Sequence, residues 1–260
     1  MTTREGRLRS HDYPFLMQCW RRLARRGGLR MSKFAESGGQ EIYCLESPRR
    51  EGGGLYLSAG IHGDESASVV ALLEWAESEI PFLQNFPVLI FPCLNPWGLI
   101  HNCRLDCGGR DLNRQFHTAR LPQIAAHKRL LAGRQFEVAA TLHEDYDARG
   151  VYLYEIARAR PFLGEQLLGA ASQCLPRESR ASIEGRRCRD GLIRRRITPE
   201  TMKQHPEAFV LHFHHSLRTI TLETPSEFSI HERVEAHLSA LRAIQSFLVF
   251  QNKSGHPASR

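Results

Sequence analysis

The chain has 260 residues, of which 42% are hydrophobic and 24% charged, an ordinary composition for one globular domain. No apolar stretch approaches the roughly 20 residues that a membrane-spanning helix needs, which excludes a membrane protein. The N-terminus carries charge but no apolar segment follows it, and the seven cysteines show no pairing pattern. These features predict a cytoplasmic protein with reduced thiols.

The first part of the chain contains both helical and strand patterns. Residues 1–40 are predicted to form an N-terminal helical extension, because apolar side chains recur at helical spacing within residues 11–30. Apolar or alternating runs separated by turn residues predict the elements that follow. In chain order these are strand 41–46, strand 55–59, helix 66–79, strand 87–91, a turn at 95–98 and a loop over 99–118.

The second part continues the alternation of strands and helices. Its predicted elements are helix 120–134, strands 138–142 and 151–154, helix 161–174, an Arg/His-rich loop region 177–218, strand 218–222 and helix 230–250. Within the loop region, residues 211–215 are expected to form an exposed alternating strand or turn. The whole pattern predicts a single α/β domain, residues 1–260, with a mostly parallel or mixed twisted sheet covered by helices on both faces.

Much of the net charge of +7 is local, since eight arginines fall within residues 177–196. A solvated surface loop is the simpler interpretation of this cluster. The alternative is a specificity loop that attracts anionic substrate groups. A basic chain could also bind nucleic acid, but no RNA-binding aromatic signature accompanies the charge, so no nucleic-acid partner is expected.

Polar side chains that can bind a metal follow the predicted strands. His62 and Glu65 stand just after strand 55–59, and His143 ends strand 138–142. Ligand sites in open α/β sheets lie beyond the carboxyl ends of strands, so we expect these three side chains to meet. Two imidazoles and one carboxylate are typical of a hydrolytic zinc site, which predicts one Zn²⁺ per chain that activates water. His-x-x-Glu alone is a common spacing, and the prediction therefore depends on the agreement between distant segments.

Further motifs follow in a characteristic order. They are Asp111-Leu-Asn113-Arg114 in the loop after Asn95-Pro96, His143 followed by Glu144-Asp145-Tyr146, and Thr219-Ile-Thr-Leu-Glu223-Thr-Pro225. With these motifs the chain resembles the zinc carboxypeptidase superfamily, from about residue 55 to residue 225. That superfamily includes the digestive carboxypeptidases and the succinylglutamate desuccinylase/aspartoacylase branch. The resemblance implies a zinc-carboxypeptidase-like fold.

The resemblance also implies a role for each matching residue. His62, Glu65 and His143 would hold the zinc, and Glu223 would be the general base that takes a proton from water and passes it to the leaving amine. The remaining implied roles are Arg104 polarising the scissile carbonyl, Arg114 gripping a substrate carboxylate with Asn113 beside it, and Asp111 hydrogen-bonding the far nitrogen of His62.

One feature of the digestive enzymes is missing. Their mobile tyrosine should have its counterpart within residues 180–218, which contain no tyrosine. Tyr146, Tyr152 and Tyr154 lie near the third ligand and could partly substitute, with Tyr146 as a candidate substrate-binding residue.

Three functions follow from these patterns. The first is a metallocarboxypeptidase-like zinc hydrolase that cleaves a peptide or amide bond next to a free carboxylate. The second is an N-acyl amino acid deacylase. For these two functions, the expected partner is a small peptide or an N-acyl amino acid substrate. The third, from another class, is a non-catalytic basic domain that binds nucleic acid.

Overall fold

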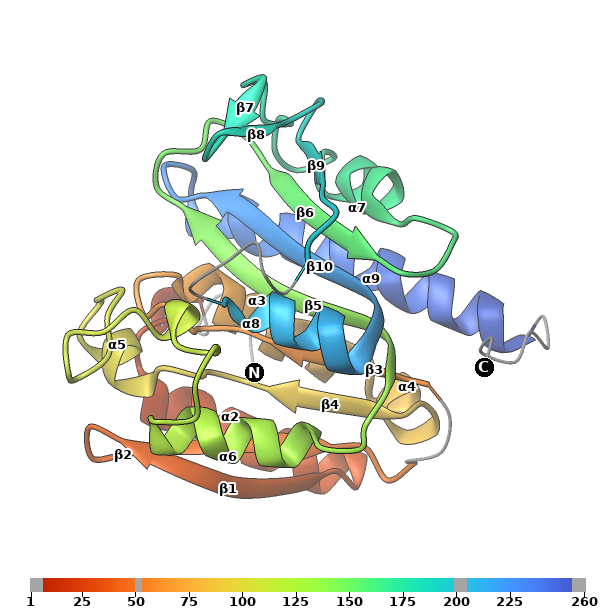
Figure 1. Cartoon of the computed structure of the whole chain (residues 1–260). Helices are drawn as coiled ribbons and strands as arrows, with labels where there is room; N and C mark the ends of the chain where they lie inside the picture. The colour runs from red at the N-terminus through yellow and green to blue at the C-terminus, as the bar shows by residue number, and fades with distance from the viewer. Residues whose placement is uncertain (1–6, 50–52, 199–204, 254–260) are drawn as a thin grey trace.

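The computed structural model describes residues 7–49, 53–198 and 205–253 (Figure 1). An eight-stranded sheet runs through the molecule in the order β1-β2-β4-β3-β5-β10-β6-β9. Its strands are β1 (Arg30–Ser37), β2 (Gln40–Glu46), β3 (Gly54–Ser58), β4 (Val88–Phe91), β5 (Phe136–Asp145), β6 (Tyr152–Ala157), β9 (Leu192–Arg194) and β10 (Ser216–Pro225). A separate hairpin joins β7 (Ser182–Ile183) to β8 (Arg186–Arg187).

The central strands β4, β3, β5 and β10 are parallel. β1 and β2 pair antiparallel with their neighbours, and β6 pairs antiparallel with β10 but parallel with β9. The strands of the parallel centre are almost wholly buried, as expected for strands covered on both faces. The sheet therefore confirms the predicted mixed α/β architecture.

Helices cover both faces of the sheet (Figure 1). The main core lies between the sheet and α2, α3, α7 and α9, and a second core lies under α6 and α8. The helices are α2 (Tyr13–Gly27), α3 (Ser66–Ser78), α4 (Ile80–Asn85), α5 (Pro96–Ile100), α6 (Pro122–Leu131), α7 (Gly164–Ala171), α8 (Glu207–Val210) and α9 (Ile230–Lys253). None of the helices in the described ranges is long and apolar enough to cross a membrane.

Most predicted elements are present within a few residues of their expected bounds. The predicted loop region 177–218 differs, because its described residues include β7, β8, β9 and α8. The predicted helical extension 1–40 also differs, because it contains the strand β1 after α2. This edge strand pairs with β2 through the two-residue turn Gly38–Gly39, and both glycines have positive φ (59° and 74°). Such a turn matches the twist of a hairpin and favours glycine at both positions. Because β1 itself lacks alternation, this Gly-Gly pair was the one sequence signal for it.

Two short segments also differ from expectation. Residues 95–98 were predicted as a turn, but Asn95 caps the helix α5 by accepting a hydrogen bond from Gly98 N (3.0 Å). Residues 211–215 form a π-helical turn with Leu211 and His212 buried, so the predicted exposed strand is wrong. Helical winding brings Leu211 against the core, which an alternating pattern does not anticipate.

Candidate metal centre

The three predicted ligands meet beyond the carboxyl ends of β3 and β5. His62 and Glu65 lie in the turn between β3 and α3, and His143 lies near the end of β5. Glu65 Oε1 is 2.5 Å from His62 Nδ1, and Glu65 Oε2 is 2.9 Å from His143 Nδ1. All three side chains are buried, and one candidate ligand atom from each lies within 4.8 Å of the others. One carboxylate thus faces the Nδ1 atoms of both imidazoles.

Gly63 allows the turn between these ligands to approach α5. A Cβ atom on Gly63 would stand 1.9 Å from the carbonyl carbon of Gly98, which no real contact allows. Its φ is not in the left-handed region, so close approach to α5 is what requires glycine here. The turn is held by a hydrogen bond from Gly63 N to Cys103 O (3.1 Å).

Asp111 lies beside the other nitrogen of His62, as expected. Its Oδ1 is 3.1 Å from His62 Nε2, and its Oδ2 accepts a hydrogen bond from Arg104 at 3.0 Å. A carboxylate on the far nitrogen fixes the tautomer and orientation of a ligating imidazole. Arg104 also lies 3.6 Å from Glu65, and its side chain is 43% exposed, so its guanidinium lies at the open side of the site.

Glu223 lies on the strand next to His143. The register of β10 against β5 pairs the two residues, and paired residues project on the same face of the sheet. Glu223 is partly exposed on that face. Burial of its carboxylate, opposed by His143, raises its pKa to about 8.

The three candidate substrate-binding residues differ in exposure and in contacts. Asn113 is buried, and its Oδ1 accepts a hydrogen bond from Glu207 N (2.9 Å), so its oxygen holds α8 in place. Arg114 is half-buried and donates to Asn113 O at 3.3 Å. Tyr146, in the turn after β5, is 75% exposed.

The neighbouring tyrosines are bound to carboxylates. The Tyr152 hydroxyl donates to Asp145 Oδ2 (2.8 Å), and the Tyr154 hydroxyl donates to Glu184 Oε2 (3.2 Å). Of the three tyrosines considered from sequence, Tyr146 is the one whose ring projects into solvent.

Glu144 supports the site from behind, a role that sequence reasoning missed. Its carboxylate accepts a hydrogen bond from Ala67 N at the start of α3 (2.6 Å) and pairs with Arg233 on α9. It thereby fixes the end of β5 against the helix that follows Glu65. The alternation of side chains along a strand could have indicated this role, because it places Glu144 on the opposite face of β5 from His143.

Asn95 and Glu207 are also structural residues of the site. Asn95 Nδ2 donates to Leu105 O (3.1 Å), which positions the loop that carries Arg104. Glu207 accepts hydrogen bonds from the hydroxyls of Tyr56 and Ser58 in β3. No local pattern marks Glu207, because its partners come from distant parts of the chain.

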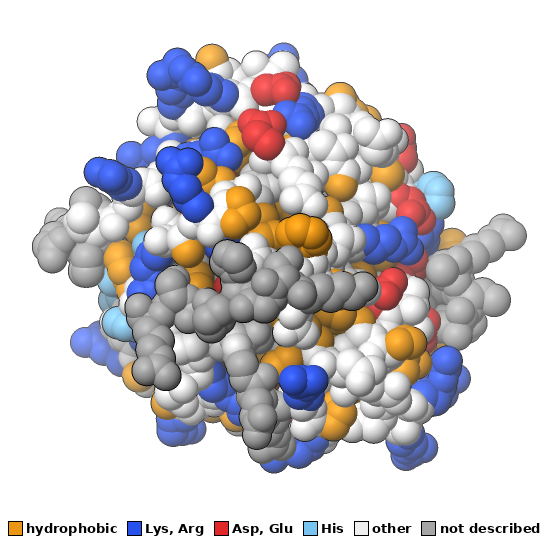
Figure 2. Space-filling view, turned by 90° about the vertical axis from the view of Figure 1, so that its right-hand side faces the viewer, with side chains coloured by type: hydrophobic (Ala, Val, Ile, Leu, Met, Phe, Trp, Pro, Cys, Tyr) orange, Lys and Arg blue, Asp and Glu red, His pale blue; other side chains and the backbone are white. Residues whose placement is uncertain are grey.

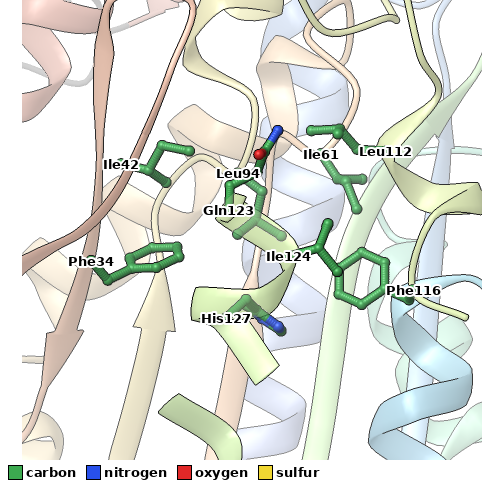
Figure 3. Close-up of a pocket in the computed structure, with 9 residues that line it drawn as sticks. All are labelled: Phe34, Ile42, Ile61, Leu94, Leu112, Phe116, Gln123, Ile124 and His127. Carbon is green, nitrogen blue, oxygen red and sulfur yellow. The ribbon is translucent and has the colours of Figure 1, made fainter. Parts of the chain in front are cut away.

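A small apolar cavity lies behind the ligand loops (Figure 3). Its lining includes Ile61 and Leu112, which directly precede His62 and Asn113 in the chain, and its volume is about 10 Å³. That is room for one water at most. The cavity therefore belongs to the packing that fixes the ligand loops, not to a substrate pocket.

The electrostatics of the site favour a cation. Burial opposes charging of His62, but Glu65 and Asp111 outweigh burial and raise its pKa to about 9. Glu65 and Glu223 likewise raise the pKa of His143 against its burial. For Glu65, burial is outweighed by the two imidazoles, and its pKa is lowered. A metal ion could supply the positive charge that protons otherwise bring, and two imidazoles with one carboxylate suit a divalent transition metal.

Comparisons with known proteins agree with this geometry. Residues 51–150 match the model of the succinylglutamate desuccinylase/aspartoacylase catalytic domain. No curated protein sequence matches the chain.

Among solved structures, a candidate metallopeptidase from Shewanella amazonensis SB2B superposes with a TM-score of 0.81 at 22% identity, covering 92% of this chain and 94% of its own. A metallo-carboxypeptidase from Burkholderia cenocepacia gives 0.65 at 15% identity, with 90% and 68% covered. The murein-tripeptide amidase MpaA from Escherichia coli O157 gives 0.56 at 19% identity, with 83% and 91% covered. The family match over residues 51–150 and the fold shared with these structures support the zinc carboxypeptidase-like superfamily.

Proposed function

We propose that the chain is a zinc-dependent hydrolase that cleaves a peptide or amide bond next to a free carboxylate, in the manner of a metallocarboxypeptidase. The observation that carries the proposal is the orientation of both buried Nδ1 atoms toward Glu65, with Glu223 paired in register with His143. The names of the structural neighbours, metallopeptidase, metallo-carboxypeptidase and amidase, describe the same kind of bond cleavage.

His62, Glu65 and His143 would hold the metal, which would supply Lewis-acid activation of water and of the scissile carbonyl. Asp111 keeps the His62 ring oriented through its Nε2 nitrogen. Glu223 accepts a proton from the attacking water and passes it to the leaving amine, a task that suits a carboxylate with a raised pKa. The partly exposed guanidinium of Arg104 lies where it can stabilise negative charge on the carbonyl oxygen.

Recognition of the substrate carboxylate falls to Arg114. A guanidinium binds a carboxylate through two parallel hydrogen bonds, and no acidic side chain pairs with Arg114 in the described ranges. Asn113 holds the backbone beside it, and the exposed Tyr146 lies where it can cover bound substrate.

An N-acyl amino acid deacylase is the second candidate, favoured by the match of residues 51–150 to the desuccinylase/aspartoacylase domain. The two activities differ in which side of the scissile amide carries the recognised carboxylate. Either substrate would be a small molecule with one free carboxylate near the bond.

One set of measurements tests the function. Zinc is quantified in the purified protein, which is then assayed on N-acetyl dipeptides, their C-terminal amides and N-acyl amino acids. We expect cleavage of the free acids and not of the amides. Glu223→Gln should retain zinc and lower kcat by about 10²-fold or more. Glu227→Gln, an exposed carboxylate in the next turn, is the matched control and should keep full activity. A fully active Glu223→Gln variant would refute the proposed base.

A further inference from the structure

A groove lined by arginines opens at the β9 edge of the sheet. Its volume is about 290 Å³, and it is lined by Arg186, Arg187, Ile193, Arg194, Arg195 and Arg196. The hairpin β7–β8 supplies the first two arginines, and β9 with its continuation supplies the rest. In Figure 2, basic side chains gather toward the upper left of the surface, with few acidic side chains among them.

The positive charge of this groove is largely uncompensated. Arg194 pairs with the buried Glu155 at 2.7 Å. Arg186, Arg187, Arg195 and Arg196 form no ion pair with an acidic side chain within residues 7–49, 53–198 and 205–253, although Glu184 lies close enough to favour the charge of Arg195. Burial, and then the neighbouring Arg186, lower the pKa of Arg195, which shows the mutual repulsion of the cluster. A bound anion would relieve that repulsion.

The sheet register places this groove on the catalytic face. Glu223 pairs with Tyr152 across β10 and β6, and Tyr154 pairs with Ile193 across β6 and β9. Since alternate residues of a strand and their paired neighbours share a face, Ile193 lies on the same side of the sheet as Glu223. Two strand spacings across the sheet, about 10 Å, and two residues along β6, about 7 Å, separate them, which together give about 12 Å.

The hairpin is fixed to this face by a small apolar cluster. Ile183 and Cys188, at the two ends of the hairpin, pack against Tyr152 and Ile193. The arginines on β8 are therefore held near the catalytic face by packed side chains. Figure 1 shows the hairpin at the upper edge of the molecule, beyond β6.

We infer that the arginine groove is a substrate subsite that binds acidic side chains of a peptide, about three residues away from the bond that is cleaved. Three to four extended residues span about 10–13 Å, which matches the separation of Ile193 from Glu223. Guanidinium groups bind carboxylates in pairs of hydrogen bonds. No aromatic side chain lines the groove, so it lacks the stacking surface that single-stranded nucleic acids use. The inference rests on the proposed function, because that function supplies the peptide substrate whose acidic side chains the groove would bind.

A binding experiment tests the subsite without requiring turnover. Fluorescein-labelled hexaglutamate and hexaglutamine peptides are titrated with the Glu223→Gln protein in 0.15 M salt and followed by fluorescence anisotropy. We expect hexaglutamate to bind at least 10-fold more tightly than hexaglutamine. Adding Arg186→Gln and Arg187→Gln should remove most of that preference, as should adding Arg195→Gln alone.

The matched control adds Arg25→Gln and Arg26→Gln, which remove the same charge from exposed positions at the end of α2. This control should keep the preference for hexaglutamate. Equal affinity for the two peptides would overturn the inference, and so would a preference that the groove substitutions leave unchanged. Thermal unfolding of each variant shows whether its fold is intact.

A second arm distinguishes an acidic peptide from any polyanion. A six-nucleotide deoxythymidine strand should compete with hexaglutamate at least 10-fold less well than unlabelled hexaglutamate does. Equal competition would show a general polyanion surface and overturn the inference. If the protein prefers hexaglutamate but cleaves no amide substrate, the proposed function is refuted and the anion-binding site stands. Amide hydrolysis without that selectivity would remove only the subsite.

Discussion

Two pairs of buried histidines in this protein differ in what surrounds them. His62 and His143 face the carboxylate of Glu65, and their pKa values are raised against the effect of burial. His127 and His237 are equally buried, but burial lowers the pKa of each to about 3. The first pair favours positive charge, whereas the second pair is held neutral.

The hydrogen bonds of His127 show why it remains neutral. The Tyr56 hydroxyl donates to Glu207, so His127 Nε2 donates to the tyrosine oxygen at 2.7 Å. Its Nδ1 has no hydrogen-bond partner among the described residues. The ring lies against the aromatic side chains of Phe91 and Phe116. A carboxylate is also near His127, since Glu207 Oε1 lies 3.6 Å from Nε2, but the Tyr56 hydroxyl contacts both groups and binds that carboxylate. Carboxylates in direct hydrogen-bond contact with the ring nitrogens, rather than burial, thus distinguish a candidate metal ligand from a core histidine.

The largest expected effect tests this distinction directly. His62→Ala should abolish stoichiometric zinc binding and lower amide hydrolysis by about 10³-fold or more, since the metal contributes several kcal/mol to catalysis. His127→Phe should retain one zinc per chain, because His127 provides no ligand atom to the site. Zinc content by mass spectrometry and rates on the same substrate measure both outcomes. If the His62→Ala variant still bound one zinc per chain, the distinction between the two pairs of histidines would be refuted.

A smaller effect is expected from the carboxylate behind His62. Asp111→Asn removes the charge at His62 Nε2 while keeping the shape of the side chain, and such partners contribute about 10- to 100-fold to metal affinity. Competition with a chelator measures the change. Asp147→Asn, an exposed position in the turn after β5, removes the same charge without touching either imidazole and should bind zinc as tightly as the unaltered protein. Equal affinity of the Asp111→Asn variant would mean that Asp111 does not support the ligand.

The sequence anticipated the residues of the site better than their support. His62, Glu65, His143 and Glu223 stand at the ends of apolar runs, and hydrophobic patterning predicts where such runs end and which sheet edge they share. The resemblance to a family then related Asp111 to His62, and the two side chains do lie together.

The supporting contacts could not be predicted because they join segments far apart in the chain. Glu144 connects β5 to α3 and α9, and Glu207 connects α8 to β3. Nothing in the local sequence of either glutamate specifies such partners. The position of the arginine groove could not be predicted either. The arginine content predicted the positive charge, but only the register of β6 and β9 places the groove on the same face as Glu223.

The smallest expected effect concerns the neutral histidines and appears as a dependence of stability on pH. The folded state keeps His127 unprotonated down to about pH 3, whereas the unfolded chain takes up a proton near its ordinary value of 6.5. Stability from this group is therefore complete above pH 6.5 and is lost as the pH falls toward 3. At pH 5 the loss amounts to about 2 kcal/mol for one imidazole. His127→Phe removes the group and should flatten the fall in stability below pH 6.5 by about that amount.

Urea unfolding between pH 7.5 and 5 measures this change. The control is Phe116→Leu, which trims a neighbour of the His127 ring and should lower stability by a similar amount at every pH. An unchanged pH profile in His127→Phe would mean that the folded protein accepts a proton at His127. The contrast with His62 would then be one of ligand geometry alone, because both imidazoles would tolerate positive charge.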